Sequence, residues 1–432
     1  MATTYYVDSE GGDDQSSGAS PEQDWSTLKH IKEMIFKPGD RILFKAGTRY
    51  TGQLKPQGSG CLIQPLVIDV YGKGDKPRID GEGEVLQTLY LYNIEYWEVN
   101  NLEITNTGKD RQPNRKGVFV HIKDFGVAHH IHLRNLYIHD VNGSLVKAEG
   151  GGDAISWRNE GSEKKSRFDG LLIEGCHIKC CERNGIMGGG YWTRDQWYPS
   201  LNVVIRKNLL EGVPGDGIVP TACDGALVEY NVMRDCPRLL PDSEAAAGIW
   251  PWSCDNTVIQ FNEVSEHKSP WDGQGFDSDW NCRHTIIQYN YSHDNEGGFL
   301  LICNDGNNNM PYNIGNEDTV ARYNISVNDG LRATGKHVGF SPTFHITGPC
   351  KNTKVYNNVI YITRKPDAKI DRRLLKMDNW GGPWPVNTWF TNNIFSAEDT
   401  VQYDFGNAIS TVFENNFYYG DHQNSPSKRK DS

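Results

Sequence analysis

The sequence lacks long apolar runs and has fewer basic than acidic residues. No stretch of about 18 apolar residues occurs, so we expect no transmembrane helix. Lys and Arg number 44, Asp and Glu number 55, and the formal net charge is −11. Because nucleic-acid binding requires a basic surface, this charge argues against a nucleic-acid partner. A neutral ligand fits the charge, whereas a polyanion would need a local basic patch.

Cysteine pairs with metal-site spacing are missing as well. The ten cysteines are spread from Cys61 to Cys350 without a CxxC pair, and the adjacent Cys180 and Cys181 are poorly placed to share one ion. We therefore predict buried thiols in a core, and one or two disulfides remain open. We expect no cofactor, with Ca²⁺ as the one ion left open for the acidic site described below.

No signal peptide is recognisable. The first residues, Met-Ala-Thr-Thr-Tyr-Tyr-Val-Asp, lack the basic and apolar segments of an export signal. The chain is therefore either cytoplasmic or without its signal in this sequence. We expect a secreted or periplasmic monomer.

The sequence is rich in glycine and aromatic residues, and it repeats. With 45 Gly, 20 Tyr and 12 Trp but only 37% hydrophobic residues, it is typical of a turn-rich β protein. Segments such as Val258-Ile-Gln-Phe-Asn-Glu-Val and Ile286-Ile-Gln-Tyr-Asn-Tyr-Ser recur, mostly at intervals of 23 to 35 residues. The recurring Asn falls at positions 101, 135, 208, 231, 262, 290, 324, 358, 393 and 416, and Cys176 takes its place in the long gap.

A repeat of this length indicates a solenoid or a propeller. Each unit reads as strand, Asn bend, second strand, loop and a third strand with Gly, which is one coil of a parallel β-helix. Asn suits the bend because it tolerates the left-handed conformation, and stacked Asn residues would form a ladder. A β-propeller, the alternative, needs four strands per blade at steadier spacing. We find no internal linker and predict one all-β domain over residues 1–420, with a disordered tail at 421–432.

The N-terminal region has the features of a solenoid cap. Ser26 or Thr27 can cap a short helix with Leu28, Ile31 and Ile35 at helical spacing. Such a helix would cover the open end of the first coil. This cap, within about the first 50 residues, and the repeat that follows resemble right-handed parallel β-helix proteins of the pectate-lyase-like superfamily. The resemblance implies a single-domain right-handed parallel β-helix with a polysaccharide-binding groove.

One stretch combines acidic and aromatic residues on the third strands of successive coils. The segments Ile249-Trp-Pro-Trp, Phe276-Asp-Ser-Asp and Phe299-Leu-Leu-Ile align, each after a Gly. Because strand residues alternate between faces, two side chains of each segment face outward. We predict two outward columns, with Trp250, Asp277 and Leu300 in one and Trp252, Asp279 and Ile302 in the other.

Asp277 and Asp279 are the main candidates for catalysis. Their Cα atoms are about 6.6 Å apart and their carboxyl groups about 5 to 9 Å apart. This covers retaining and inverting glycoside hydrolysis, with inversion somewhat favoured. The second anion raises the pKa of the first, which keeps one Asp protonated as the acid. Trp250 and Trp252 would offer flat apolar surfaces to sugar rings. A Ca²⁺ site and a solvated surface pair are the alternatives for the two carboxylates.

Further candidates lie around this pair. Asp216 and His293 are additional catalytic candidates, although Asp216 also suits a turn cap. His293-Asp294 stands at the same offset from its bend as His139-Asp140, which indicates a structural turn. The candidates for substrate binding, besides the two Trp residues, are Trp157, Arg158, Asp272, His345 and Asp305.

Three reaction classes are compatible with these residues. The segment 272–303 resembles β-helix glycosidases typified by certain xylosidases and fucosidases, which often carry a Glu on the next coil. In this sequence Leu300 to Cys303 stand at that place, and polygalacturonase motifs are absent. We predict a glycoside hydrolase that cleaves a poly- or oligosaccharide with paired Asp residues. The alternatives are a non-catalytic carbohydrate-binding β-helix and a Ca²⁺-assisted polysaccharide lyase. The candidate bases for a lyase are Arg158, Lys336, His345 and Lys376.

Overall fold

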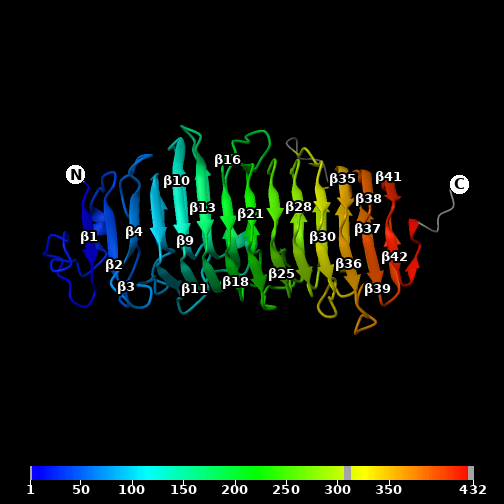
Figure 1. The fold of residues 1–432 in the computed structure, drawn as a ribbon, viewed down its shortest axis with the longest axis horizontal. Helices are drawn as coiled ribbons and strands as arrows, with labels where there is room; N and C mark the ends of the chain where they lie inside the picture. Colours follow the sequence, from blue (N-terminus) through cyan, green and yellow to red (C-terminus); the bar gives the residue numbers. More distant parts are fainter. Residues whose placement is uncertain (1, 306–312, 427–432) are drawn as a thin grey trace. The chain divides into compact units, whose positions relative to one another are not determined.

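The computed structural model describes residues 2–305 and 313–426. Their contacts divide the chain into two compact units: unit 1 comprises Met1–Gly190 and Ser200–Val213, and unit 2 comprises Tyr191–Pro199 and Pro214–Ser432. The regular secondary structure of both units is almost entirely strand, and the strands, drawn as arrows in Figure 1, pair in parallel. Among the described residues, no helix is long and apolar enough to cross a membrane.

Unit 1 contains three parallel sheets. The first sheet holds β1 (Thr4–Val7), β2 (Arg41–Lys45), β4 (Leu66–Tyr71), β7 (Trp97–Asn100), β10 (Val127–Arg134), β13 (Arg167–Glu174), β16 (Ser200–Leu201) and β17 (Val204–Arg206). The second holds β3 (Arg49–Thr51), β5 (Arg78–Asp80), β8 (Glu103–Asn106), β11 (Tyr137–Asn142), β14 (His177–Glu182) and β18 (Leu209–Glu211). The third holds β6 (Gln87–Tyr92), β9 (Lys116–Lys123), β12 (Asp153–Glu160) and β15 (Asn184–Met187). The 3-10 turn η1 (Lys147–Glu149) precedes β12.

Unit 2 repeats this arrangement. Its first sheet holds β20 (Cys223–Asp224), β21 (Leu227–Glu229), β24 (Val258–Gln260), β28 (Ile286–Gln288), β31 (Asn316–Glu317), β32 (Val320–Arg322), β35 (Cys350–Tyr356), β38 (Val386–Thr391) and β41 (Ile409–Glu414). The second holds β22 (Val232–Arg234), β25 (Glu263–Ser265), β29 (Tyr291–His293), β33 (Ile325–Val327), β36 (Val359–Ile362), β39 (Ile394–Ala397) and β42 (Phe417–Tyr419). The third holds β27 (Gln274–Ser278), β30 (Gly298–Cys303), β34 (Phe344–Thr347), β37 (Arg373–Asp378), β40 (Val401–Asp404) and β43 (His422–Gln423). The short strands are β19 (Ile218–Val219), β23 (Ala245–Ala246) and β26 (Trp271–Asp272).

The predicted Asn ladder is present in unit 2. Each ladder Asn before the last one, Asn416, donates its backbone N–H and its Nδ2 to the Oδ1 of the Asn on the next coil, at 2.9–3.0 Å. The left-handed conformation belongs to the residue before the ladder position, such as Tyr289 at φ 56°. Asn101 and Asn135 occupy this preceding position, at φ 60° and 53°, which corrects their predicted place in the ladder. The ladder residues are Asn231, Asn262, Asn290, Asn324, Asn358, Asn393 and Asn416.

The cysteines are unpaired thiols, most of them in the core. All ten lie within the described ranges and none forms a disulfide; eight are buried, while Cys61 is half-buried and Cys180 is exposed. The predicted stack of thiols is visible in unit 2, where the N–H of Cys223 lies 3.3 Å from the Sγ of Cys254 on the next coil.

The chain ends differ in part from the expectations. Helix α1 (Lys29–Glu33) is a single turn that buries Ile31, whereas Ile35 lies beyond it and is 72% exposed. Thr27 Oγ1 accepts the Lys29 N–H at 3.2 Å. At the other end, β43 pairs with β40 and His422 is buried, so the described residues 421–426 are not a disordered tail. Residues 427–432 lie outside the described part of the chain.

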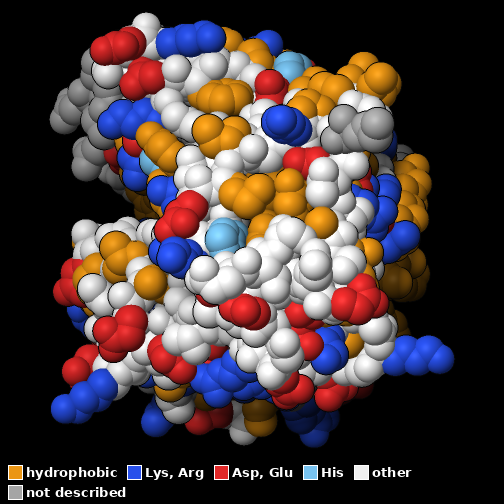
Figure 2. All heavy atoms as spheres, turned by 90° about the vertical axis from the view of Figure 1, so that its left-hand side faces the viewer, with side chains coloured by type: hydrophobic (Ala, Val, Ile, Leu, Met, Phe, Trp, Pro, Cys, Tyr) orange, Lys and Arg blue, Asp and Glu red, His pale blue; other side chains and the backbone are white. Residues whose placement is uncertain are grey.

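Charges of both signs are mixed on the face shown in Figure 2. Blue Lys and Arg side chains and red Asp and Glu side chains lie among apolar and uncharged ones there. In unit 1, ion pairs join such side chains, for example Lys45 with Asp8 at 2.6 Å and Arg49 with Asp80 at 2.7 Å.

Candidate active site

Strand β27 carries Asp277 in the third sheet of unit 2, and Asp279 directly follows the last residue of the strand, Ser278. The N–H of Asp277 donates to the carbonyl oxygen of Ile249 at 3.2 Å, and the N–H of Asp279 donates to that of Pro251 at 3.3 Å. The two aspartates therefore lie beside the segment that carries Trp250 and Trp252, as predicted.

On its other side, β27 pairs with β30, and Asp277 stands opposite Leu301. The predicted alignment, which matched glycine with glycine, placed Leu300 and Ile302 in the outward columns. The observed register is shifted by one residue, so Leu301 and Cys303 take those places. All six residues of β30 are buried, and no exposed polar side chain marks its outward face.

Asp277 is buried in a cluster of carboxylates. It is 3% exposed, and its Oδ1 has no hydrogen-bond partner. Burial raises the pKa of Asp277 well above its usual range, and the negative charges of Asp279, Asp272 and Asp216 raise it further. The surroundings therefore favour the protonated form of Asp277.

Asp279 is half-buried and more strongly hydrogen-bonded. Its Oδ1 accepts the Trp280 N–H at 2.6 Å and the Cys303 thiol at 3.0 Å. Such bonds stabilise the ionised carboxylate. One ligand atom each of Asp277, Asp279 and Cys303 lie within 4.8 Å of one another. The two carboxyl groups are thus close together, at the short end of the separation expected from the sequence.

Trp250 and Trp252 have different surroundings. Trp250 is 6% exposed, and its Nε1–H donates to Asp216 Oδ1 at 3.1 Å. Asp216 is fully buried and also accepts the Ala247 N–H at 3.1 Å. Trp250 is therefore not the open platform that we predicted, because Asp216 holds its indole within the fold. Trp252 is half-buried and stacks on Trp192, with the ring centroids 5.0 Å apart and the planes at 22°.

The second ring of this stack comes from the segment Tyr191–Pro199, none of whose residues was singled out from the sequence. Arg194 anchors the segment: its side chain is 4% exposed, and its Nη2 bonds Asp255 Oδ1 at 2.8 Å and the carbonyl oxygen of Asn281. The guanidinium carbon lies 4.2 Å from the centre of the Trp197 ring.

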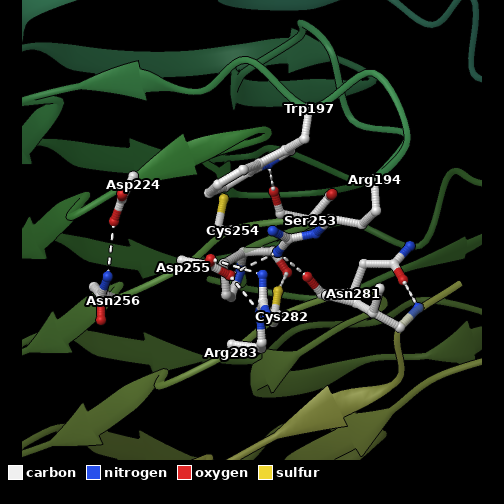
Figure 3. Close-up of polar contacts among 12 residues, drawn as sticks. Arg194, Trp197, Asp224, Ser253, Cys254, Asp255, Asn256, Asn281, Cys282 and Arg283 are labelled. Carbon is white, nitrogen blue, oxygen red and sulfur yellow. Dashed lines mark hydrogen bonds and ion pairs between the residues drawn. The ribbon is translucent and has the colours of Figure 1, made fainter. Parts of the chain in front are cut away.

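Trp197 forms a further contact of the segment. Its Nε1–H donates to the carbonyl oxygen of Ser253 at 3.0 Å, and the hydroxyl of Ser253 bonds the Trp192 carbonyl oxygen. Figure 3 shows Arg194 and Trp197 reaching toward the chain around Ser253 and Asp255. These contacts fix an aromatic wall beside Trp252, whose strand neighbours Asp279.

The outward column continues beyond β30. The register places His345 opposite Leu301 and Lys376 opposite His345. Nε2 of His345 lies 3.0 Å from Asp378 Oδ2, and its ring packs edge-on against Trp380 at 5.8 Å. His345 is thus on the same face as Asp277, two coils or about 10 Å further along the stack.

His293 does not join the site. It lies on β29 in the second sheet, where Nδ1 contacts Asp294 Oδ2 at 2.8 Å and Nε2 contacts Glu263 Oε1 at 3.4 Å. His139 in unit 1 has the same arrangement, with its ring nitrogens 2.7 Å from Asp140 and 2.9 Å from Glu103. The matching contacts of His293 and His139 favour the structural-turn interpretation, and the catalytic role of His293 stays a prediction for a side chain that lies on the second sheet.

The remaining predicted residues fall into two groups. Trp157 and Arg158 lie on β12 in unit 1; Trp157 is 1% exposed and presents no free ring face, and Arg158 pairs with Glu160 at 3.2 Å. Asp272 is half-buried on β26, and its charge reaches Asp277. Asp305 is half-buried and follows the end of β30 by two residues.

Two groups of side chains within residues 2–305 and 313–426 offer metal ligands. One is the set of Asp277, Asp279 and Cys303 in unit 2. The other comprises Glu98, His130 and His132 in unit 1 and was not predicted; the His-Ile-His spacing is its sequence signal. There Arg134 Nη2 lies 2.7 Å from His132 Nδ1 and already occupies that nitrogen.

The chain is similar in sequence to a curated glycosidase. It is 28% identical over 520 aligned positions to the lacto-N-biosidase of Bifidobacterium longum subsp. longum. The alignment covers 96% of this chain and 30% of that protein. The chain therefore spans about three tenths of the length of the curated relative it matches. No protein-family model matches the sequence.

Solved structures agree with the fold. The crystal structure of a GH136 lacto-N-biosidase from Eubacterium ramulus is 27% identical and has a TM-score of 0.73, over 96% of this chain and 68% of that chain. A mannuronic acid-specific polysaccharide family 6 lyase from human gut microbiota has a TM-score of 0.52 at 13% identity, over 99% of this chain and 89% of that chain, which concerns the fold alone. These likenesses confirm a right-handed parallel β-helix of the pectate-lyase-like type.

Proposed function

We propose that this chain is a glycoside hydrolase that cleaves an oligosaccharide with the aspartate side chains of the β27 segment. The observation that carries the proposal is the buried carboxyl of Asp277, whose Oδ1 has no hydrogen-bond partner, beside the more exposed carboxylate of Asp279. The sequence relative and the structural neighbour at 27–28% identity, both named lacto-N-biosidases, support it. Their name makes glycans that carry lacto-N-biose the first substrates to test.

The two carboxyl groups divide the chemistry between them. Asp277, favoured in its protonated form, donates its proton to the glycosidic oxygen as the carbon–oxygen bond breaks. The ionised Asp279 attacks the anomeric carbon and forms a glycosyl-enzyme, because the close spacing is nearest to the about 5–5.5 Å of retaining enzymes. Asp277, now ionised, takes a proton from the water that releases the sugar. This spacing favours retention over the inversion suggested by the sequence.

Asp272 is the alternative acid. A group that protonates a substrate must reach it, and Asp272 is half-buried whereas Asp277 is 3% exposed. If Asp272 delivers the proton, Asp277 affects the reaction only through its electrostatic interaction with Asp272. Separate substitution of the two residues distinguishes these assignments.

The decisive experiment is an activity panel with matched variants. We would incubate the purified protein with lacto-N-biose-bearing oligosaccharides, neutral aryl glycosides and alginate. The readouts are new reducing ends and the absorbance of unsaturated uronate, with and without a chelator. We expect reducing ends from a neutral glycan, unaffected by the chelator. Asp279→Asn and either Asp277→Asn or Asp272→Asn should lower kcat/KM by about 10²–10⁴-fold.

The control is Asp294→Asn, whose carboxylate contacts His293 on the second sheet and should leave activity unchanged. Unsaturated product that disappears on chelation would overturn the hydrolase proposal. It would also assign Asp277 and Asp279 to a Ca²⁺ site.

The lyase alternative has weaker support. It needs a base beside a uronate and a group that neutralises the uronate carboxylate. Of the expected bases, Lys376 pairs with Asp404 at 2.6 Å and His345 with Asp378 at 3.0 Å, so each already faces a carboxylate. We find no specific observation that favours elimination.

We also propose that the protein acts as a monomer outside the cytoplasm and needs no cofactor for turnover. The glycan substrate class supports this location. Cell fractionation of the native host, light scattering of the purified protein and activity after exhaustive chelation test the three statements separately.

A further inference from the structure

The carboxylate cluster of unit 2 includes a thiol. Sγ of Cys303 lies 3.0 Å from Asp279 Oδ1, and Asp277, Asp279 and Cys303 each offer one ligand atom within 4.8 Å of the other two. Zn²⁺ lies about 2.0–2.3 Å from its ligands, so tetrahedral neighbours are about 3.3–3.7 Å apart. Small side-chain rotations bring the three atoms to this spacing.

Asp277 gives a second, independent indication of a ligand. Its carboxyl group, which supplies one oxygen to the cluster, is almost completely buried, and Oδ1 has no hydrogen-bond partner. The charges of three further carboxylates act on it. Burying like charges without a counterion is costly, and a bound cation removes that cost.

We propose that Asp277, Asp279 and Cys303 form a binding site for a thiophilic divalent cation of the Zn²⁺ and Cd²⁺ class. The thiolate selects these ions over Ca²⁺ and Mg²⁺, which prefer oxygen ligands. Binding releases the thiol proton of Cys303, and any proton on Asp277, to solvent, so the affinity rises with pH. Three protein ligands leave the fourth tetrahedral position to water.

The ion competes with a glycan for the same side chains. It takes the lone pairs of Asp279 and displaces the proton of Asp277, so the nucleophile and the acid are lost together. This competition rests on the proposed function, whereas binding of the ion does not. We therefore expect Zn²⁺ to inhibit turnover and Ca²⁺ to leave it unchanged.

The test uses Cd²⁺ as the probe, because a Cd²⁺–thiolate bond gives an ultraviolet charge-transfer band. The starting protein carries Cys61→Ala and Cys180→Ala, which remove the two cysteines that reach the surface. From it we would make Cys303→Ala and, as the matched control, Cys236→Ala, which removes another buried thiol. Cd²⁺ on Glu98, His130 and His132 gives no such band and does not interfere.

We expect a saturable band in the starting protein and in Cys236→Ala, and Zn²⁺ should displace it. In Cys303→Ala the band should be absent. The affinity of unit 2 for Zn²⁺ should fall by at least about 10-fold, because losing a residue that only hydrogen-bonds a metal ligand already costs that much. Lack of a band in the starting protein, or an unchanged band in Cys303→Ala, would overturn the site. A normal band without inhibition of a demonstrated hydrolase would overturn only the competition, and absence of any hydrolase activity leaves the binding result intact.

Discussion

Asp277 and Asp279 are two residues apart in the sequence but have different electrostatic surroundings. Asp277 is buried with one oxygen unpartnered, whereas Asp279 is half-buried and accepts two hydrogen bonds. Water and donors stabilise an ionised carboxylate, and burial among like charges destabilises it. The pair is therefore differentiated by its environment, as an acid and a base must be.

This environment predicts a pH-dependent cost in stability. Because the pKa of Asp277 is raised in the folded protein, the fold binds a proton that the unfolded chain releases near pH 4. Stability is therefore complete below that pH and falls as the pH rises through the raised pKa. Each unit of elevation corresponds to about 1.4 kcal/mol.

Asp277→Asn should remove this cost. We expect the variant to be more stable than the wild type at pH 7 and the difference to shrink toward pH 4, as measured by urea unfolding at both values. A difference that stays constant with pH would contradict the assignment. Asp294→Asn serves as the control, because that carboxylate is partly exposed and already paired with His293.

Among the elements, the segment Tyr191–Pro199 depends on a single buried cation. Arg194 holds it to Asp255 and Asn281, and the segment in turn places Trp192 on Trp252. Breaking a buried ion pair by removing one partner costs about 3–5 kcal/mol. Arg194 is thus a positioning residue for the aromatic wall.

Arg194→Gln should release the wall. We expect faster proteolytic cleavage within residues 191–199 and a rise in KM of about tenfold with a smaller change in kcat, because the wall contacts bound sugar and not the reacting atoms. Asp195→Asn, on the exposed side of the segment, is the matched control. A fall in kcat as large as the rise in KM, without new proteolytic cleavage in residues 191–199, would contradict this role.

The Asn ladder is the second element with a clear energetic role. Asn290 accepts two hydrogen bonds from Asn262 at 3.0 Å and donates its Nδ2 to the carbonyl oxygen of Ile259 at 3.0 Å. All these groups are buried. Removing the side chain leaves unsatisfied groups that cost about 1–3 kcal/mol each.

Asn290→Ala should therefore destabilise the protein by about 2–4 kcal/mol, measured by denaturant unfolding. Gln260→Ala is the control, because its outward amide bonds only the surface partners Glu229 and Gln288 and should cost less than about 1 kcal/mol. If Asn290→Ala is no more destabilised than Gln260→Ala, the ladder hydrogen bonds contribute no more to stability than the hydrogen bonds to water that they replace.

At the scale of the whole molecule, the net charge of −11 bears on the kind of substrate. A polyanion would be repelled, and its binding would change steeply with salt. A neutral glycan experiences no such force. Between about 0.01 M and 1 M ionic strength, where the Debye length falls from about 30 to 3 Å, we expect KM for a neutral substrate to change less than about threefold. A strong fall of KM with salt would instead indicate an anionic substrate.

Much of the fold was readable from the sequence because each coil carries the same local signals. The recurring Asn, the period-two strands and the Gly-containing third strand predicted a parallel β-helix, and the ladder from Asn231 to Asn416 confirms it. The adjacency of Asp277 and Asp279 to the Trp250–Trp252 segment was also predictable. It depends only on strand alternation and on the stacking of successive coils.

Coil-to-coil register and loop placement were not readable in this way. The one-residue shift that sets Cys303 beside Asp279, the burial of Trp250 by Asp216, and the docking of Arg194 on Asp255 emerged only in three dimensions. The sequence by itself determined the structure of a single coil, because the pattern of strands, Asn and Gly repeats from one coil to the next. Only the tertiary structure decided which side chains meet across coils. Packing, burial and electrostatics between distant segments set those contacts, and they produce no repeating pattern in the sequence.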